Sequence, residues 1–120
     1  MVKYTMESDK MSFTINIHYK GQNGTAKKFA TEMITSGIVE EIRSKEGNLK
    51  YEYYEPLEDK ETILLIDSWK NQESLDEHHK SETMKKITEL REKYDLHTKA
   101  ERYLSDDEAF SDKDEAFLRK

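Results

Sequence analysis

The strongest constraint on the fold of this chain is a strict alternation of apolar and polar residues between Phe13 and Tyr19. The segment reads Phe-Thr-Ile-Asn-Ile-His-Tyr, so every second side chain is apolar and those between them are polar or hydrogen-bonding. A period of two is that of a β-strand with one buried face. A lone strand is not stable in water, and the pattern therefore predicts a sheet covered on one side.

Three further segments have the character of strands. Residues 49–54 alternate again, with Leu49 and the tyrosines Tyr51 and Tyr53 expected on one face. Residues 62–69 carry apolar side chains on both faces, which is typical of a strand covered on both sides. Residues 96–104 form a weaker final strand.

Two helical regions separate these strands. Residues 25–43 place apolar side chains at helical spacing behind Thr25, which we expect to cap a single helix. The second region begins after Asn71, with a break and a fresh start near Ser81. The resulting order βαββαβ predicts an α+β protein with a ferredoxin-like fold.

Composition limits the size of the core and the class of partner. Only 34% of the 120 residues are apolar and 38% are charged, so a single copy has a thin core, which favours pairing with a second copy. The net charge of −6 argues against nucleic acid as a partner, because no basic stripe is present to neutralise phosphates.

The chain divides into three parts by the same reasoning. Residues 1–11 are a polar N-terminal extension, residues 12–104 are one domain, and residues 105–120 are an acidic tail that could form a short docking helix or remain loose. There is no cysteine, which excludes disulfides and thiolate chemistry. The longest apolar run is 63–66, too short for a membrane span, so we expect a cytoplasmic protein without membrane contact.

Two adjacent histidines follow the only tryptophan of the chain. If Leu75 faces the core, His78 lies about 60° to one side and His79 about 40° to the other, so both can approach the buried face. We expect His79 to be solvated or at an interface. Because adjacent helical side chains point about 100° apart and no HExxH spacing occurs, the sequence predicts no metal site.

Other polar and aromatic residues are candidates for a binding site. Trp69 ends a buried strand, where it either fills core or forms a pocket wall. Asn16 lies between two isoleucines, and its amide needs a ligand oxygen or a backbone group as partner if it is buried. His18 shares its face, while Tyr51 and Tyr53 either pack the strand or line a pocket.

Three segments together resemble a known family. They are NGTAKKF at the start of the first helix, IRSKEGNLKYE entering the second strand, and LLIDSWKNQESLDEHHKS running from strand to helix. In this order and spacing they resemble the antibiotic biosynthesis monooxygenase family, which includes quinol monooxygenases, over roughly residues 12–104. The resemblance implies a homodimer whose sheets form an α/β barrel, with a pocket between the sheet and the helices of each subunit.

The resemblance also implies a chemistry and a set of residues. Several family members oxidise electron-rich aromatics or quinols with molecular oxygen and need no flavin, metal or other cofactor. Their pockets commonly use an asparagine, an aromatic residue and a histidine, which map here onto Asn16, Trp69 and His78 as predicted catalytic residues. The Asn16 match requires a one-residue insertion in the turn that follows. We expect His18, Tyr51, Tyr53 and His79 to bind substrate.

Three functions follow as hypotheses. The first is a cofactor-independent monooxygenase acting on a small aromatic or quinol-like substrate, with His78 as base because an imidazole titrates near neutral pH. The second is an isomerase of a small signal-type carbonyl compound, since KEGNLKYE is also similar to family members of that kind. The third is a non-catalytic dimer that binds haem or another hydrophobic molecule, although Thr88 stands where haem-degrading relatives have the histidine iron ligand.

Overall fold

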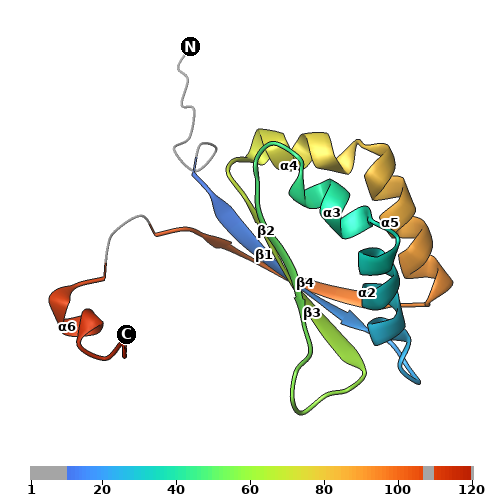
Figure 1. The fold of residues 1–120 in the computed structure, drawn as a ribbon, viewed down its shortest axis with the longest axis horizontal. Helices are drawn as coiled ribbons and strands as arrows, with labels where there is room; N and C mark the ends of the chain where they lie inside the picture. Colours follow the sequence, from blue (N-terminus) through green and yellow to red (C-terminus); the bar gives the residue numbers. More distant parts are fainter. Residues whose placement is uncertain (1–10, 107–109, 120) are drawn as a thin grey trace.

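The computed structural model describes residues 11–106 and 110–119 of the chain, and Figure 1 shows its fold. The part of the N-terminal extension before Met11 lies outside the described residues. The elements in chain order are β1 (Phe13–Lys20), α2 (Thr25–Thr35), α3 (Ile38–Arg43), β2 (Asn48–Tyr54), β3 (Thr62–Trp69), α4 (Gln72–His79), α5 (Glu82–Lys93), β4 (His97–Leu104) and α6 (Asp112–Glu115).

The four strands form one antiparallel sheet in the order β2-β3-β1-β4. Each β-α-β connection therefore joins two strands that have another strand between them, β3 in the first case and β1 in the second, which is the split arrangement of a ferredoxin-like fold. All four strands lie where the alternation of apolar and polar residues places them, to within one residue at their ends. The predicted α+β, ferredoxin-like fold is confirmed.

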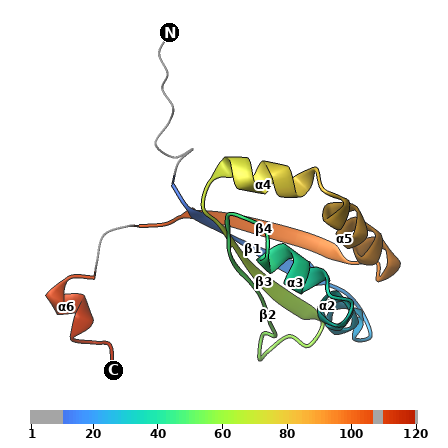
Figure 2. The same ribbon diagram turned by 45° about the horizontal axis from the view of Figure 1, so that its top comes forward.

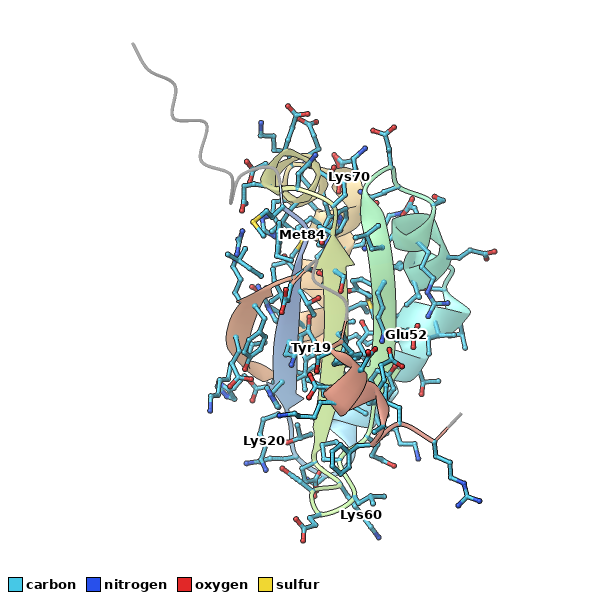
Figure 3. The ribbon with its side chains drawn as sticks, turned by 90° about the vertical axis from the view of Figure 1, so that its left-hand side faces the viewer. Tyr19, Lys20, Glu52, Lys60, Lys70 and Met84 are labelled. Carbon is cyan, nitrogen blue, oxygen red and sulfur yellow. The ribbon has the colours of Figure 1, made fainter. Side chains whose placement is uncertain are left out.

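The helices α2 to α5 cover one face of the sheet, and the other face is open (Figures 1 and 2). Directly paired residues of antiparallel strands point to the same side, so the register assigns each side chain to a face. Ile17, its partner Leu65 and every second residue on either side face the helices. Asn16, its partner Ile66 and their alternate neighbours face the open side, which Figure 3 views directly.

The hydrophobic core lies between the sheet and the helices. Its largest fully buried side chains come from β1, α2, α3 and β3, and burying each one stabilises the fold by about 1.5–3 kcal/mol. These side chains are Phe13, Phe29, Met33, Ile42, Leu65 and Trp69.

The helix predicted over residues 25–43 is wrong as a single element, because it is divided into α2 and α3 at Gly37. Gly37 has φ of 87°, a left-handed conformation that ends α2 and starts α3 in a new direction. Thr25 is not the cap either, since Gly24 occupies the N-cap position of α2 without a side-chain cap, and the Thr25 hydroxyl accepts from the Gln22 N–H instead. The glycine interrupts a stripe of apolar residues that would otherwise continue.

The predicted start signals of the second helical region are confirmed. The Asn71 side chain accepts a hydrogen bond of 2.9 Å from the Ser74 N–H and caps α4. The Ser81 hydroxyl accepts from the Met84 N–H at 3.3 Å and caps α5. Asn71 lies two residues beyond the end of β3, so the cap fixes the direction in which α4 leaves the sheet.

A β-bulge near the start of β2 changes which residues face the core. The pairing with β3 shifts between Asn48 and Lys50, so two residues of β2 oppose one of β3. Leu49, predicted to share the face of Tyr51, is instead 59% exposed. Asn48 pairs with Trp69 and takes the inward place.

Glu61 joins two loops at one end of the sheet. Its carboxylate accepts hydrogen bonds from the N–H groups of Asn23 (3.2 Å) and Gly24 (2.9 Å), and its carbonyl accepts from the Gly21 N–H at 2.9 Å. The negative charge lies at the start of α2, where the helix dipole stabilises it. The loop before β3 is thus fastened to the loop after β1.

Beyond β4 the tail runs away from the sheet and contains the short helix α6 (Figure 1). Phe110 and Phe117, which flank this helix, are both exposed. Across the described parts of the chain, each helix is too short or too polar to cross a membrane.

Candidate functional site

Trp69 and His78 form a stacked pair beneath the first turns of the second helical region. Their ring centroids are 5.0 Å apart and the planes are inclined by only 24°. Trp69 is 0% exposed at the end of β3, and His78 is 4% exposed in α4. The Asn71 cap produces this contact, because it starts α4 so that Leu75 and His78, three residues apart, both face the sheet.

The surroundings of His78 favour the neutral imidazole. Burial, reinforced by the charge of Lys45 and by His79, lowers the pKa of His78 to about 4. The Lys45 ammonium donates to the Ser81 hydroxyl at 2.9 Å, which holds it near the C-terminal end of α4. His78 is therefore uncharged at neutral pH. The titration near neutrality, on which its predicted role as base rested, does not describe this site.

Asp67 is a buried carboxyl group that the sequence analysis did not single out as functional. It lies on β3 two residues before Trp69, on the same inward face, and is 5% exposed. Burial raises the pKa of Asp67 to about 7, although the Trp69 indole and the Asn48 amide both act to lower it. The Asn48 Nδ2 donates weakly to Asp67 Oδ1 at 3.4 Å. The bulge in β2 makes this contact possible.

Three polar atoms around these residues have no hydrogen-bond partner of ordinary geometry. They are the Tyr53 hydroxyl, the Trp69 Nε1 and the His78 Nδ1, all buried from solvent. The indole N–H affects the pKa of Asp67 without completing a hydrogen bond to it. Because buried polar groups are nearly always paired, three orphans in one region indicate a place for a polar guest or water.

Tyr51 and Tyr53 lie on the inward face of β2, next to Asp67 and Leu65 respectively. Their rings meet edge to face with centroids 5.8 Å apart, and Tyr53 also contacts Phe29. Burial raises the pKa of both hydroxyls, so both stay neutral donors. The sequence left packing and pocket lining open for these residues, and both remain compatible with their positions.

Asn16 is not brought to this region. It pairs with Ile66 and lies half-buried on the open face of the sheet, opposite to the face that carries Trp69. The physical reason is the period of two, since a shift by one residue moves a side chain to the other face. The expected convergence of Asn16 with Trp69 and His78 within one subunit is corrected accordingly.

His18 and His79 are also outside the buried group. His18 shares the open face with Asn16, and its Nε2 lies 3.5 Å from a carboxylate oxygen of Glu101. His79 is exposed, as expected from the sequence, with its ring centroid 6.0 Å from that of His78. Among the residues that the structure describes, no group of three or more potential metal ligands is clustered.

A surface hollow of about 330 Å³ reaches His78 from outside, between the end of α3 and α4. Its walls are formed by Lys45, Glu46, Glu73, Ser74, Glu77 and His78. Two hollows of about 710 and 580 Å³ border α2 and the loop before it and touch no predicted site residue. Two more, of about 460 and 370 Å³, touch His18 and His79 respectively, away from the buried pair. The hollow at His78 is thus the natural approach to the Trp69–His78 pair.

The arrangement defines a small α+β protein of ferredoxin-like fold, with a buried aromatic and acidic group between its sheet and its helices. The sequence model of one family, antibiotic biosynthesis monooxygenase, matches residues 12–90. The chain belongs to the antibiotic biosynthesis monooxygenase family. A comparison with curated proteins found no match.

Solved structures share the fold. A conserved protein of unknown function from Bacteroides thetaiotaomicron has a TM-score of 0.71 at 14% identity, over 80% of this chain and 99% of that one. A conserved protein from Methanosarcina mazei Go1 has a TM-score of 0.67 at 23% identity, over 81% and 95%. SnoaB, a cofactor-independent oxygenase from Streptomyces nogalater, has a TM-score of 0.66 at 5% identity, over 82% and 95%. At these identities the likeness shows the fold alone.

Proposed function

We propose that the protein is a cofactor-independent monooxygenase that oxidises a small, electron-rich aromatic or quinol-like substrate with molecular oxygen. The proposal is supported by membership of the family and by the fold shared with SnoaB, an oxygenase of this kind. The observation that carries it in this chain is the stacked pair of Trp69 and His78, whose ring nitrogens lack partners in a buried setting.

The proposed reaction needs little from the protein beyond binding, dry surroundings and proton transfer. A phenolic hydroxyl loses its proton, and the resulting anion passes one electron to oxygen. The substrate radical and superoxide combine at a ring carbon and give a hydroperoxide. Loss of the hydrogen on that carbon and cleavage of the O–O bond give a quinone and water, so one oxygen atom stays in the product.

Trp69 and His78 have separate tasks in this proposal. The indole, one face of which is covered by His78, forms a wall beside the aromatic ring of the substrate, and exclusion of water strengthens every polar contact made there. The neutral imidazole of His78 accepts a hydrogen bond from the substrate and orients it. Its pKa of about 4 makes it a weak proton acceptor at neutral pH, so orientation is the better-supported role.

Oxygen-dependent turnover tests the proposal. Quinols and hydroxylated aromatics are assayed in air and under nitrogen with the native chain, with His78→Gln and with the exposed-histidine control His97→Gln. We expect turnover in air alone, a loss of at least about tenfold in His78→Gln, and native rates in the control. Product formed equally under nitrogen contradicts an oxygenase and supports the isomerase. Unchanged turnover in His78→Gln removes this residue from the mechanism.

We also propose that two copies pair through the open faces of their sheets, as the family resemblance implies. Leu64 and Ile66 lie at the centre of this face, half-buried, and Tyr54 and Tyr103 are partly exposed on its two edge strands. Helices cover only the opposite face (Figure 2). A pairing of open faces buries this apolar strip and places Asn16 and His18 at the subunit interface.

A further inference from the structure

The inward face of β3 carries an acid where alternation calls for an apolar residue. The other inward positions of this strand are occupied by the core residues Ile63, Leu65 and Trp69, whereas Asp67 has a carboxyl group that can ionise. Asp67 accepts only the weak hydrogen bond from Asn48, so ionising it in this buried place is costly, and proteins keep such a carboxyl mainly where it has a task. Asp67 therefore requires an explanation that packing does not supply.

The polar groups around Asp67 on this face are the Asn48 amide, which donates to it weakly, the hydroxyl of its cross-strand partner Tyr51, and two further donors. The Trp69 indole N–H lies two residues along the same strand, and the Tyr53 hydroxyl lies on β2 beside the cross-strand partner of Asp67. Both are buried without partners. One acceptor group and two free donors are the set that a hydroxyl group satisfies, since it donates once and accepts twice.

We propose that Asp67 is a catalytic residue, which takes the proton from an aromatic hydroxyl group bound against the Trp69 N–H and the Tyr53 hydroxyl. This inference rests on the proposed oxidation and names its substrate class as a phenol or an enol. His78, stacked on the same indole, then orients the substrate through its unpartnered Nδ1.

The proton transfers balance through the whole reaction. The substrate O–H bond breaks, its electron pair remains on the oxygen, and the proton binds Asp67. Trp69 and Tyr53 donate to the resulting phenolate, as donors do in an oxyanion hole. Asp67 returns the proton to the peroxide, then takes the proton of the ring carbon and delivers it to the departing hydroxide as water. The carboxyl ends the cycle as it began.

The pKa values of the surrounding groups support this assignment. A base works best when its pKa is close to the working pH, and the pKa of Asp67 is about 7 whereas that of His78 is about 4. Burial raises the pKa values of the nearby tyrosines, so they stay neutral. The groups near Asp67 on neighbouring strands are Tyr19 of β1 and Asn48, Tyr51 and Tyr53 of β2. Three further ionisable groups lie on the same side of the sheet: Arg43 of α3 donates to the Tyr51 carbonyl, His78 of α4 stacks on Trp69, and Arg102 of β4 lies over the Phe13 ring.

The first experiment measures kcat/KM against pH for the native chain, Asp67→Asn and His78→Gln. Asp76→Asn is the matched control, because it removes a carboxylate from the exposed side of α4. We expect kcat/KM of the native chain to rise as pH increases through about 7. In Asp67→Asn we expect kcat/KM to be lower by about 100-fold or more, without this rise. The rise of kcat/KM near pH 7 persists in His78→Gln and Asp76→Asn. If Asp67→Asn keeps the native kcat/KM and the same rise, the proposal is overturned.

The second experiment measures binding without turnover, and so separates this inference from the proposed function. Under nitrogen, 4-methylphenol is titrated against the fluorescence of Trp69, the only tryptophan, excited at a wavelength that 4-methylphenol does not absorb. We expect Kd to fall as pH rises through about 7, because ionised Asp67 accepts the phenol O–H, and we expect no pH dependence in Asp67→Asn. Tyr53→Phe weakens binding by up to about tenfold.

The two experiments fail in different ways. pH-dependent binding of 4-methylphenol without any oxygen-dependent turnover keeps Asp67 as the recognition group for a phenol and refutes the oxygenase. Oxygen-dependent turnover together with binding that is identical in Asp67→Asn keeps the oxygenase and refutes this inference. Far-UV circular dichroism at each pH confirms that the variants are folded.

Discussion

Asp67 and His78 have opposite effects on how the free energy of unfolding changes with pH, and this gives the sharpest prediction. The pKa of Asp67 rises from 3.8 to about 7 on folding, so between these values the folded state holds one more proton and stability falls as pH rises. The pKa of His78 falls from 6.5 to about 4, so over that range stability is lost as pH falls. Between about pH 4.5 and 6.5 the two effects cancel.

Removing either group exposes the slope of the other. A change of one bound proton between states alters the free energy of unfolding by about 1.4 kcal/mol per pH unit. We expect Asp67→Asn to gain stability with rising pH at about this slope, and His78→Gln to lose it at a similar slope. At about pH 8, Asp67→Asn is more stable than the native chain by up to about 4 kcal/mol, since the amide carries no charge to bury.

Urea unfolding followed by far-UV circular dichroism at about pH 5, 6 and 7.5 measures these slopes. All samples are kept at one protein concentration, because pairing of copies contributes to apparent stability. Asp59→Asn is the control, since its partners Lys20 and Thr62 lower the pKa of Asp59 to about 2, below this window. A difference between Asp67→Asn and the native chain that does not change with pH refutes the reasoning, because Asp67 then titrates alike in both states.

Three further predictions follow from other contacts. Lys45→Gln raises the pKa of His78, because the nearby ammonium is one cause of its low value, and NMR titration of the imidazole measures this. Gly37→Ala costs about 1 kcal/mol for its φ of 87° alone, whereas Gly47→Ala costs more because its new methyl group also meets the Ser74 side chain; urea unfolding compares the two. Ile66→Lys places a charge at the centre of the open face and shifts the protein to monomers in sedimentation velocity, whereas Glu52→Lys at the edge strand does so less.

The strands could be predicted because their signal is local. Each strand alternates in its own sequence, and Asn71 and Ser81 mark helix starts by side-chain chemistry alone. The break at Gly37 could not be predicted, since nothing local distinguishes a tolerated glycine from one with positive φ. The outward turn of Leu49 depends on a bulge, which arises from pairing with another strand.

The site was predictable only in part. Trp69 and His78 come together because a cap residue links strand to helix at a fixed spacing. The prediction that Asn16 joins Trp69 and His78 was wrong because alternation shows only which residues share a face of the sheet. The assignment of Asn16 to the pocket came from the family resemblance. Asp67 carried a usable signal, a lone acid among apolar alternate positions of β3, but its unusual pKa depends on burial that only the assembled fold provides.

The fastening at Glu61 has a practical consequence for anyone who wishes to display a peptide on this scaffold. Because one carboxylate closes the turn after β1 and also belongs to the connection before β3, lengthening either stretch next to it would loosen both. The stretch around Leu57, whose side chain is 99% exposed, takes no part in the hydrogen bonds of the Glu61 carboxylate. A peptide inserted between Pro56 and Glu58 therefore leaves these hydrogen bonds intact.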